Sequence, residues 1–338
     1  MSVRPFGLLS AVFVLLTCVT VAPALGQSDP SAKLAEGAKK EGKLVWYTAM
    51  NIRDAKPILD AFAKEYPFIK TELARLTGER LINRIRTETL AGSWLFDVAS
   101  TNGLQVITKD KMSVYVSPEA EAYAPEFKDP EGRWTAYDHN YYVFAYNGKA
   151  VAEKEAPKDY QDLLNPKWKG HVVLDPEDYE WYGALVAAWG KEKTDRYMRQ
   201  LAAQNIQWRH GHGLIGEVIS TGEVAMGFPY ANQVERLKAK GSPIDWVPSF
   251  NPTVTAVNVI GLSAKPVNPN AGKLFVDFLL SKKGQEIIRE MGRLPARKDV
   301  KPLSARADPD KLQLQPVTGE VYINIKSYAE RFRKLFGL

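Results

Sequence analysis

The stretch Lys43-Leu44-Val45-Trp46-Tyr47-Thr48 decides the fold class, because it is short, apolar and rich in residues that favour β-strands. It stops at Ala49-Met50-Asn51, where polar residues return. From Ile58 to Ala63 the apolar residues recur at helical spacing, and Tyr66-Pro67 ends that pattern. The sequence therefore predicts a strand, a loop and a helix in succession.

The same alternation continues along the next part of the chain. We predict a second strand from Phe68 to Leu73, a helix opening at Thr77-Gly78-Glu79 and a third strand over Phe96-Asp97-Val98-Ala99. Strands that alternate with helices form a parallel sheet flanked by helices, and ligands of such sheets bind at the carboxyl ends of the strands. The polar loops at Thr48 to Asn51, Thr77-Gly78 and Thr101-Asn102 are therefore expected to meet at one place.

A second α/β unit is predicted after the hydrophobic run Tyr141 to Asn147, and a β-rich run from Val254 to Leu262 is predicted to cross back to the first unit. The expected fold class is α/β with two lobes, each a mixed, mostly parallel sheet flanked by helices, and two crossings that form a hinge. The expected boundaries are 27–140 and 256–308 for lobe 1, 141–255 for lobe 2, and 309–338 for a C-terminal tail with a terminal helix.

Residues 1–26 have the composition of a signal peptide. Arg4 precedes the uncharged run Leu8 to Val21, and small residues follow at Ala22-Pro23-Ala24 and Ala24-Leu25-Gly26. We therefore expect export by a cleaved N-terminal signal, and a periplasmic location for the mature chain.

The remaining composition excludes several classes of function. The single cysteine, Cys18, lies inside the predicted signal, so the mature chain has no disulfide, thiol nucleophile or thiolate metal site. Leu16-Thr17 precede it rather than small residues, so no lipid anchor is expected.

The 338-residue chain carries a formal charge of +6 without a run of basic residues, so nucleic acid is not an expected partner. We identify no Gly-x-Ser-x-Gly, His-Glu-x-x-His, Walker A or Gly-x-Gly-x-x-Gly pattern, so we expect that the protein is not an enzyme and has no cofactor. We also expect a monomer.

Together these segments resemble the type II periplasmic binding proteins of ABC importers, in the branch that contains ferric-ion and small-organic-solute receptors. The order and spacing of several segments carry the resemblance: Leu44-Val45-Trp46-Tyr47, Ala61 to Pro67, Phe96-Asp97-Val98, Tyr146-Asn147, Trp168-Lys169-Gly170, Gly222 to Gly227 and Ala271 to Gly292. The resemblance implies a two-lobed clamp that closes on a solute in its cleft and is then recognised by a membrane permease.

From this resemblance we predict the substrate-binding component of an ABC transporter, which captures a small polar organic or anionic solute. A partner of a membrane receptor that senses a solute is an alternative with the same fold. In similar ferric-ion receptors a His follows the first strand, a Glu follows the third, and a Tyr-Tyr pair lies in the second lobe. This sequence places Asn51, Asn102 and Pro229-Tyr230 at those positions, so only Tyr230 remains as an iron ligand. Because neutral Asn side chains do not offset a trivalent charge, Fe(III) is kept as the alternative ligand, not the preferred one.

Two further segments carry candidate binding residues. The first is Asp178-Tyr179-Glu180-Trp181-Tyr182, in which the aromatic rings are expected to sandwich an organic ligand and Asp178 is expected to hold a cationic group. The alternative is that the rings are ordinary packing residues. The same segment is the source of further tyrosines in the iron alternative. Arg209-His210-Gly211-His212-Gly213 precedes a predicted helix, so its backbone N–H groups are expected to face an anionic group, with a His donor beside them. A flexible exposed loop is the alternative, and no metal site is predicted because no carboxylate is close in sequence.

The predicted ligand-binding residues share a position at the end of a strand, at the start of a helix or near a crossing. They are Thr48, Asn51, Thr77, Gly78, Thr101, Asn102, Tyr142, Asp178, Tyr179, Tyr182, His212, Gly213 and Tyr230.

Overall fold

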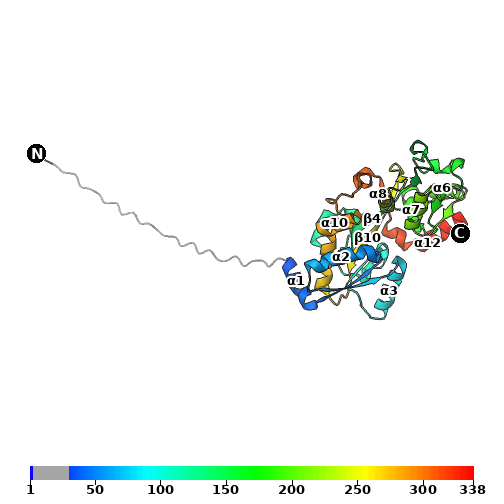
Figure 1. Ribbon diagram of the computed structural model, residues 1–338. Helices are drawn as coiled ribbons and strands as arrows, with labels where there is room; N and C mark the ends of the chain where they lie inside the picture. Colours follow the sequence, from blue (N-terminus) through cyan, green and yellow to red (C-terminus); the bar gives the residue numbers. More distant parts are fainter. Residues whose placement is uncertain (3–29) are drawn as a thin grey trace.

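The computed structural model describes residues 1–2 and 30–338 and has two α/β lobes, each built on its own sheet (Figure 1). The predicted signal peptide, with Cys18 and both candidate cleavage sites, lies outside the described residues. Within residues 1–2 and 30–338, no helix combines the length and the apolar character that crossing a membrane requires.

Lobe 1 contains a seven-stranded mixed sheet in the order β11-β4-β10-β3-β1-β2, with β12 paired to β10. The predicted strand at residues 43–48 is β1, and it pairs in parallel with β2 and β3. The strands of this sheet are β1 (Lys43–Thr48), β2 (Lys70–Arg75), β3 (Val98–Thr101), β4 (Thr135–Tyr142), β10 (Thr253–Leu262), β11 (Leu294–Pro295) and β12 (Leu314–Pro316). Its helices are α1 (Pro30–Glu41), α2 (Ile52–Glu65), α3 (Gly78–Leu90), α4 (Thr108–Lys111), α9 (Pro269–Leu280) and α10 (Lys282–Glu290).

The helix predicted after β1 is α2, and its apolar face explains its place on the sheet. Ala55, Ile58 and Phe62 are buried on that face, and the Phe62 ring meets Phe275 and Phe278 of α9 at centroid distances of 5.1 and 5.4 Å. Aromatic edge contacts of this kind add to the free energy gained by burial. Helices far apart in sequence therefore share one core in lobe 1.

Lobe 2 contains a five-stranded mixed sheet in the order β7-β6-β8-β5-β9. Its strands are β5 (Ala145–Asn147), β6 (Val172–Leu174), β7 (Gln207–Trp208), β8 (Met226–Gly227) and β9 (Ile244–Trp246), and its helices are α5 (Tyr179–Trp189), α6 (Lys191–Ala202), α7 (His212–Thr221) and α8 (Ala231–Ala239). The hydrophobic run predicted to open this lobe contains β5, and β8 is a strand of only two residues. Gly222 ends α7 in the left-handed region, with φ at 84°, so the strand begins only after that turn.

The two crossings are carried by β4 and β10, which pair antiparallel along most of their length. β10 runs over 253–262, close to the predicted 254–262. The extended run predicted at 141–147 is divided into β4, which belongs to the first sheet, and β5, which belongs to the second. The chain therefore changes lobe between Tyr142 and Ala145, and again between β9 and β10.

The C-terminal segment is an integral part of the protein, and it does contain the predicted terminal helix. After β12, α11 (Gly319–Ile323) contacts both α5 and the short 3₁₀ helix Asn102–Val106, and α12 (Ile325–Phe336) packs on α5 and α6. The Phe332 side chain is fully buried and its ring lies 5.7 Å from Tyr179 and 6.1 Å from Tyr182. Residues 309–338 therefore pack mainly against lobe 2.

Truncation of this buried ring tests the role of α12. Phe332→Ala removes a fully buried aromatic side chain, so the free energy of unfolding of the mature chain should fall by about 3–5 kcal/mol. Chemical denaturation followed by circular dichroism measures it. Ile323→Ala is the control, because its side chain is 73% exposed and should change stability by about 0.5 kcal/mol or less. Equal stability of Phe332→Ala and wild type would mean that α12 is not part of the folded core.

Candidate functional site

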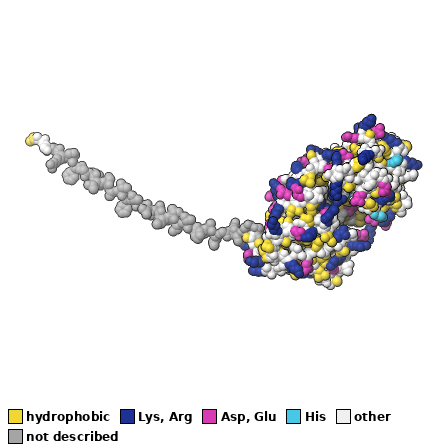
Figure 2. All heavy atoms as spheres, in the orientation of Figure 1, with side chains coloured by type: hydrophobic (Ala, Val, Ile, Leu, Met, Phe, Trp, Pro, Cys, Tyr) yellow, Lys and Arg dark blue, Asp and Glu magenta, His cyan; other side chains and the backbone are white. Residues whose placement is uncertain are grey.

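Side chains from both lobes and from the C-terminal segment meet between the lobes, where the space-filling view shows a recess (Figure 2). We call this group the interlobe cluster. Its members are linked by hydrogen bonds, ion pairs or ring contacts: Asn102, Tyr142, Asp178, Glu180, His212, Tyr230 and Tyr322.

Glu180 connects the three parts of the protein. Its Oε1 accepts a hydrogen bond of 2.8 Å from Nδ2 of Asn102, which belongs to lobe 1. Its Oε2 accepts a hydrogen bond of 3.2 Å from the hydroxyl of Tyr322, which belongs to α11. Burial raises the pKa of Glu180 to about 7, although these two hydrogen bonds favour the charged form. This carboxyl therefore titrates near neutral pH.

His212 is held on the lobe 2 side of the cluster by contacts on every side. Its Nδ1 donates to the carbonyl of Phe228 at 3.0 Å, and its Nε2 lies 3.2 Å from Oδ1 of Asp178. The ring stacks on Tyr230 at a centroid distance of 3.7 Å and meets the edge of Tyr142 at 5.1 Å. Burial lowers the pKa of His212, but the Asp178 carboxylate outweighs burial and the pKa is raised overall. Both ring nitrogens thus have partners within the protein, so His212 is not free to donate a hydrogen bond to a ligand as predicted.

Four helices begin at this cluster, and their first turns lack side-chain caps. The N-cap residues of α3, α5, α7 and α8 are Thr77, Asp178, Gly211 and Tyr230, and none of their side chains accepts a hydrogen bond from the first turn. In α2 and α10 the N-cap side chains accept such bonds, whereas α6, α9, α11 and α12 also begin without one, so it is the convergence of the four helix starts that sets this place apart. Uncapped N–H groups together with the positive end of the helix dipole favour an anionic group.

The turn before α7 has the sequence Gly211-His212-Gly213-Leu214-Ile215-Gly216, which is a Gly-x-Gly-x-x-Gly pattern. Gly211 has φ at 92°, which only glycine adopts readily, and a Cβ on Gly213 would have no atom within 4 Å. A Cβ on Gly216 would lie 3.2 Å from Leu237 of α8, so this glycine allows close helix packing. The three glycines therefore serve the tight turn, the open approach to the backbone and the packing that this pattern provides in phosphate-binding turns. The expectation that the chain lacks a Gly-x-Gly-x-x-Gly pattern is therefore wrong.

The charge of the cluster is unusual for a site that binds anions alone. Asp178 and Glu180 both lie in it, and within the described part of the chain no lysine or arginine forms an ion pair or hydrogen bond with either carboxylate. His212 forms its ion pair with Asp178, and within the described residues Glu180 has no ion pair of its own, although the charged form of His212 lowers the pKa of Glu180. A cationic group of a ligand would find its attraction here.

The loops of lobe 1 lie where the sequence predicted, but several of their side chains serve the protein itself. A Cβ on Gly78 would lie 3.3 Å from Oγ1 of Thr101 and 3.4 Å from Oδ1 of Asn102, so these two loops meet. Thr48 and Thr101 are fully buried, and Thr48 bonds to Ser100 at 2.7 Å. Asn51 is exposed and caps α2 through the N–H of Asp54. Thr77 is exposed and Gly213 is half-buried beside His212.

Tyr179 and Tyr182 point away from the interlobe cluster. The Tyr179 hydroxyl accepts a hydrogen bond of 2.6 Å from Arg333 of α12. The Tyr182 hydroxyl donates to Asp195 of α6 at 2.5 Å, and its ring packs against α12. Both rings therefore hold α12 in place, in agreement with the packing alternative, and we do not retain them as ligand-binding residues.

Two residues of the cluster were missed by the prediction. Glu180 lies in the segment 178–182, which was considered only for its rings and for Asp178. The available signal was that Glu180 directly follows Tyr179 in the first turn of α5. Tyr322 lies 142 residues from Glu180 in sequence, and no local pattern marks it. Only the packing of α11 against the start of α5 brings it to Glu180.

The cluster also contains the oxygen donors that a hard metal ion prefers. Tyr142, Tyr230 and Tyr322 supply phenol groups and Glu180 supplies a carboxylate, which are ligands suited to Fe(III). The Tyr230 and Tyr142 hydroxyls lie 3.5 Å apart. Asn51 is not part of this set, because its side chain caps α2.

Known proteins with similar sequences are solute receptors. Iron uptake protein A1 of Synechocystis sp. is 24% identical over 311 residues, which cover 86% of this chain and 85% of that protein. A putative 2-aminoethylphosphonate-binding periplasmic protein of Salmonella typhi is 25% identical over 250 residues, which cover 69% of this chain and 73% of that protein.

Solved structures share the fold over nearly the whole of their own length. Iron-bound HitA from Pseudomonas aeruginosa has a TM-score of 0.77 at 21% identity, covering 88% of this chain and 99% of that one. The periplasmic binding protein AfuA from Actinobacillus pleuropneumoniae, with fructose-6-phosphate bound, has a TM-score of 0.75 at 23% identity, covering 88% of this chain and 99% of that one. The family of bacterial extracellular solute-binding proteins matches residues 98–318. The two-lobed fold and the interlobe cluster agree with this match, and the chain belongs to the bacterial extracellular solute-binding protein family.

Proposed function

We propose that this protein captures a small zwitterionic organic solute between its lobes and delivers it to the permease of an ABC importer. The observation that carries the proposal is the presence, in one cluster, of converging helix N-termini and of a carboxylate that has no ion pair within the described residues. Helix N-termini select an anionic group, and the carboxylate selects a cationic group. The proposal narrows the expected class from a polar organic or anionic solute to one that carries both charges.

The anionic group is assigned to the turn before α7 and to the adjoining start of α8. His212 and Tyr230 stand at these two helix starts and stack on each other. The Asp178 carboxylate raises the pKa of His212, which favours the positively charged imidazolium at this place. A phosphate or phosphonate fits this place, because the open backbone at Gly213 allows close approach.

The cationic group is assigned to Glu180. Its carboxylate accepts a hydrogen bond from the Tyr322 hydroxyl, and its charge helps to raise the pKa of Tyr230, so two phenol groups surround it as well. Asn102 reaches the same carboxylate from lobe 1, so a solute held there would contact both lobes. Contact with both lobes is what makes a two-lobed clamp close on its ligand.

The names of relatives are compatible with such a solute. 2-Aminoethylphosphonate, in the name of the Salmonella typhi protein, carries a phosphonate and an ammonium group, and AfuA holds a sugar phosphate. We propose that the mature chain acts in the periplasm as a monomer, after export by the signal at residues 1–26, and that it catalyses no reaction.

A panel of solutes with matched charges tests the proposal. Zwitterions such as 2-aminoethylphosphonate, phosphoethanolamine and taurine should raise the melting temperature of the mature protein, because a ligand that binds only the folded state stabilises it. Ethylphosphonate and ethylamine, each with one of the two charges, should give smaller shifts. Equal shifts from the zwitterions and from their singly charged counterparts would contradict the assignment of two charges to the cleft.

Substitution of Glu180 tests the cationic end. Glu180→Gln keeps an acceptor for Asn102 but removes the charge, so the affinity for the zwitterion should fall at least about tenfold, since hydrogen bonds to charged groups contribute about 1.5–3 kcal/mol. The affinity for ethylphosphonate should change little. Isothermal titration calorimetry measures both, and a uniform loss for the two solutes would place Glu180 outside the cationic subsite.

The pH dependence of binding follows from the same carboxyl. Because the pKa of Glu180 is raised to about 7, the group is mostly neutral one unit below and mostly charged one unit above. The affinity for the zwitterion should therefore rise about tenfold between about pH 6 and pH 8, the ratio of the ionised fractions. Glu180→Gln should remove this rise, and the same variant corrects for any titration of the solute itself.

Fe(III) is the second candidate ligand, because three phenols and Glu180 meet in the cluster. A ferric site with phenolate ligands gives a visible charge-transfer band. Under our proposal ferric citrate gives no such band with the mature protein. A band that appears in the wild type and is lost in Tyr230→Phe would replace the zwitterion by Fe(III).

A further inference from the structure

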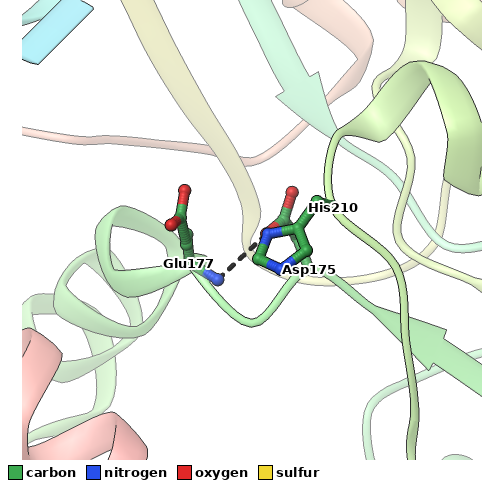
Figure 3. A group of neighbouring side chains, drawn as sticks. All are labelled: Asp175, Glu177 and His210. Atoms are coloured by element: carbon green, nitrogen blue, oxygen red, sulfur yellow. Dashed lines mark hydrogen bonds between the residues drawn. The ribbon is translucent and has the colours of Figure 1, made fainter.

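Beside the interlobe cluster, a second group of side chains has the composition of a metal site (Figure 3). Asp175, Glu177 and His210 each offer one ligand atom, and these atoms all lie within 4.8 Å of one another. Asp175 and Glu177 belong to the loop between β6 and α5, and His210 belongs to the loop between β7 and α7. The sequence alone placed no carboxylate near His210, so the group exists only in the folded chain.

Asp175 is the fixed member of the group. Its side chain is 7% exposed, and its Oδ2 accepts a hydrogen bond of 2.6 Å from the N–H of Gly211 in the neighbouring loop. Its Oδ1 accepts a hydrogen bond of 2.9 Å from the N–H of Glu177. Each carboxylate oxygen has a second lone pair, so both remain able to bind a cation. The two loops are thereby held at a set distance before any ion arrives.

Glu177 and His210 are exposed and able to adjust. In the described part of the chain neither side chain has a hydrogen bond or ion pair, and Figure 3 shows the His210 ring beside the Asp175 carboxylate. The nearest arginine in sequence, Arg209, is bonded to Glu223 at 2.6 Å and does not neutralise the pair of carboxylates. Two carboxylates and an imidazole therefore converge without a cationic side chain among them.

We propose that Asp175, Glu177 and His210 bind a divalent transition-metal ion of the zinc type, with water completing its coordination. Imidazole nitrogen combined with carboxylate oxygen suits Zn²⁺, whereas Mg²⁺ and Ca²⁺ take oxygen ligands. Ligand atoms about 2.0–2.1 Å from a tetrahedral ion lie roughly 3.3 Å apart. Small rotations of the two exposed side chains close the remaining distance, while Asp175 stays in place.

The position of this site links it to the cleft. The loop that holds Asp175 and Glu177 continues directly into Asp178 and Glu180, and the loop that holds His210 continues into His212. An ion that joins the two loops would therefore restrict the residues assigned to both ends of the solute. This role goes beyond solute capture, and it does not depend on the identity of the solute.

Metal binding is measured on the mature protein without an affinity tag, after treatment with EDTA. Zn²⁺ titrated by calorimetry should bind one site, and Co²⁺ should give the visible spectrum of a site with a nitrogen ligand. His210→Ala and Glu177→Gln should each weaken Zn²⁺ at least about tenfold, since even the loss of an outer-shell partner costs that much. Both side chains are exposed and lack partners, so neither change threatens the fold.

His171→Ala is the matched control, because His171 is an exposed histidine of the same lobe outside the group. It should bind Zn²⁺ as the wild type does. In hydrogen exchange, Zn²⁺ should protect peptides covering 175–180 and 209–213 in the wild type and in the control but not in His210→Ala. Zn²⁺ affinity that is unchanged in His210→Ala and Glu177→Gln, or equally reduced in His171→Ala, would overturn the proposal.

Discussion

The antiparallel pairing of β4 with β10 is the constraint on which the two-lobed structure depends. These strands lie in the sheet of lobe 1, yet they supply side chains to both cores: Ala136 and Val259 pack in the first, whereas Tyr142 and Val254 pack in the second. This shared strand pair joins the two lobes. The short segments between β4 and β5 and between β9 and β10 are where the chain passes from one lobe to the other. Closure of such a clamp needs only a few residues to alter their backbone angles.

A buried ion pair fixes the same strands against the rest of lobe 1. Asp138 of β4 is fully buried, and it accepts hydrogen bonds of 2.5 Å from both Asn258 of β10 and Arg293. Arg293 also pairs with Asp54 near the start of α2 at 2.9 Å. A buried carboxylate is tolerated only when it is paired and hydrogen-bonded, so these partners hold one another in a single arrangement. β4 and β10 are therefore anchored in lobe 1, and lobe 2 together with α12 is the part of the protein that a hinge motion would move.

Opposite charges stand side by side in the cleft, and this contrast governs what the site can select. Helix N-termini and His212 favour an anionic group, while Glu180 favours a cationic one. A solute with only one charge would leave the other side of the cluster without a partner, and an unpaired buried group costs free energy. Selectivity of this kind rests on the whole cluster. It also explains how one fold serves receptors for ions, phosphonates and sugar phosphates, since a few side chains at the same helix starts change the ligand.

The sequence by itself determined the alternation of strands and helices, the division into two lobes and the approach of the loops that follow the first strands of lobe 1. These features follow from local hydrophobic periodicity and from the rule that ligands bind at the ends of parallel strands. Only the tertiary structure decided which side chains of those loops are available. It turned Tyr182 toward Asp195, brought Tyr322 to Glu180 and placed Asp175 beside His210. Each of these outcomes depends on contacts between different elements of the chain, and such contacts leave no periodic trace in the sequence.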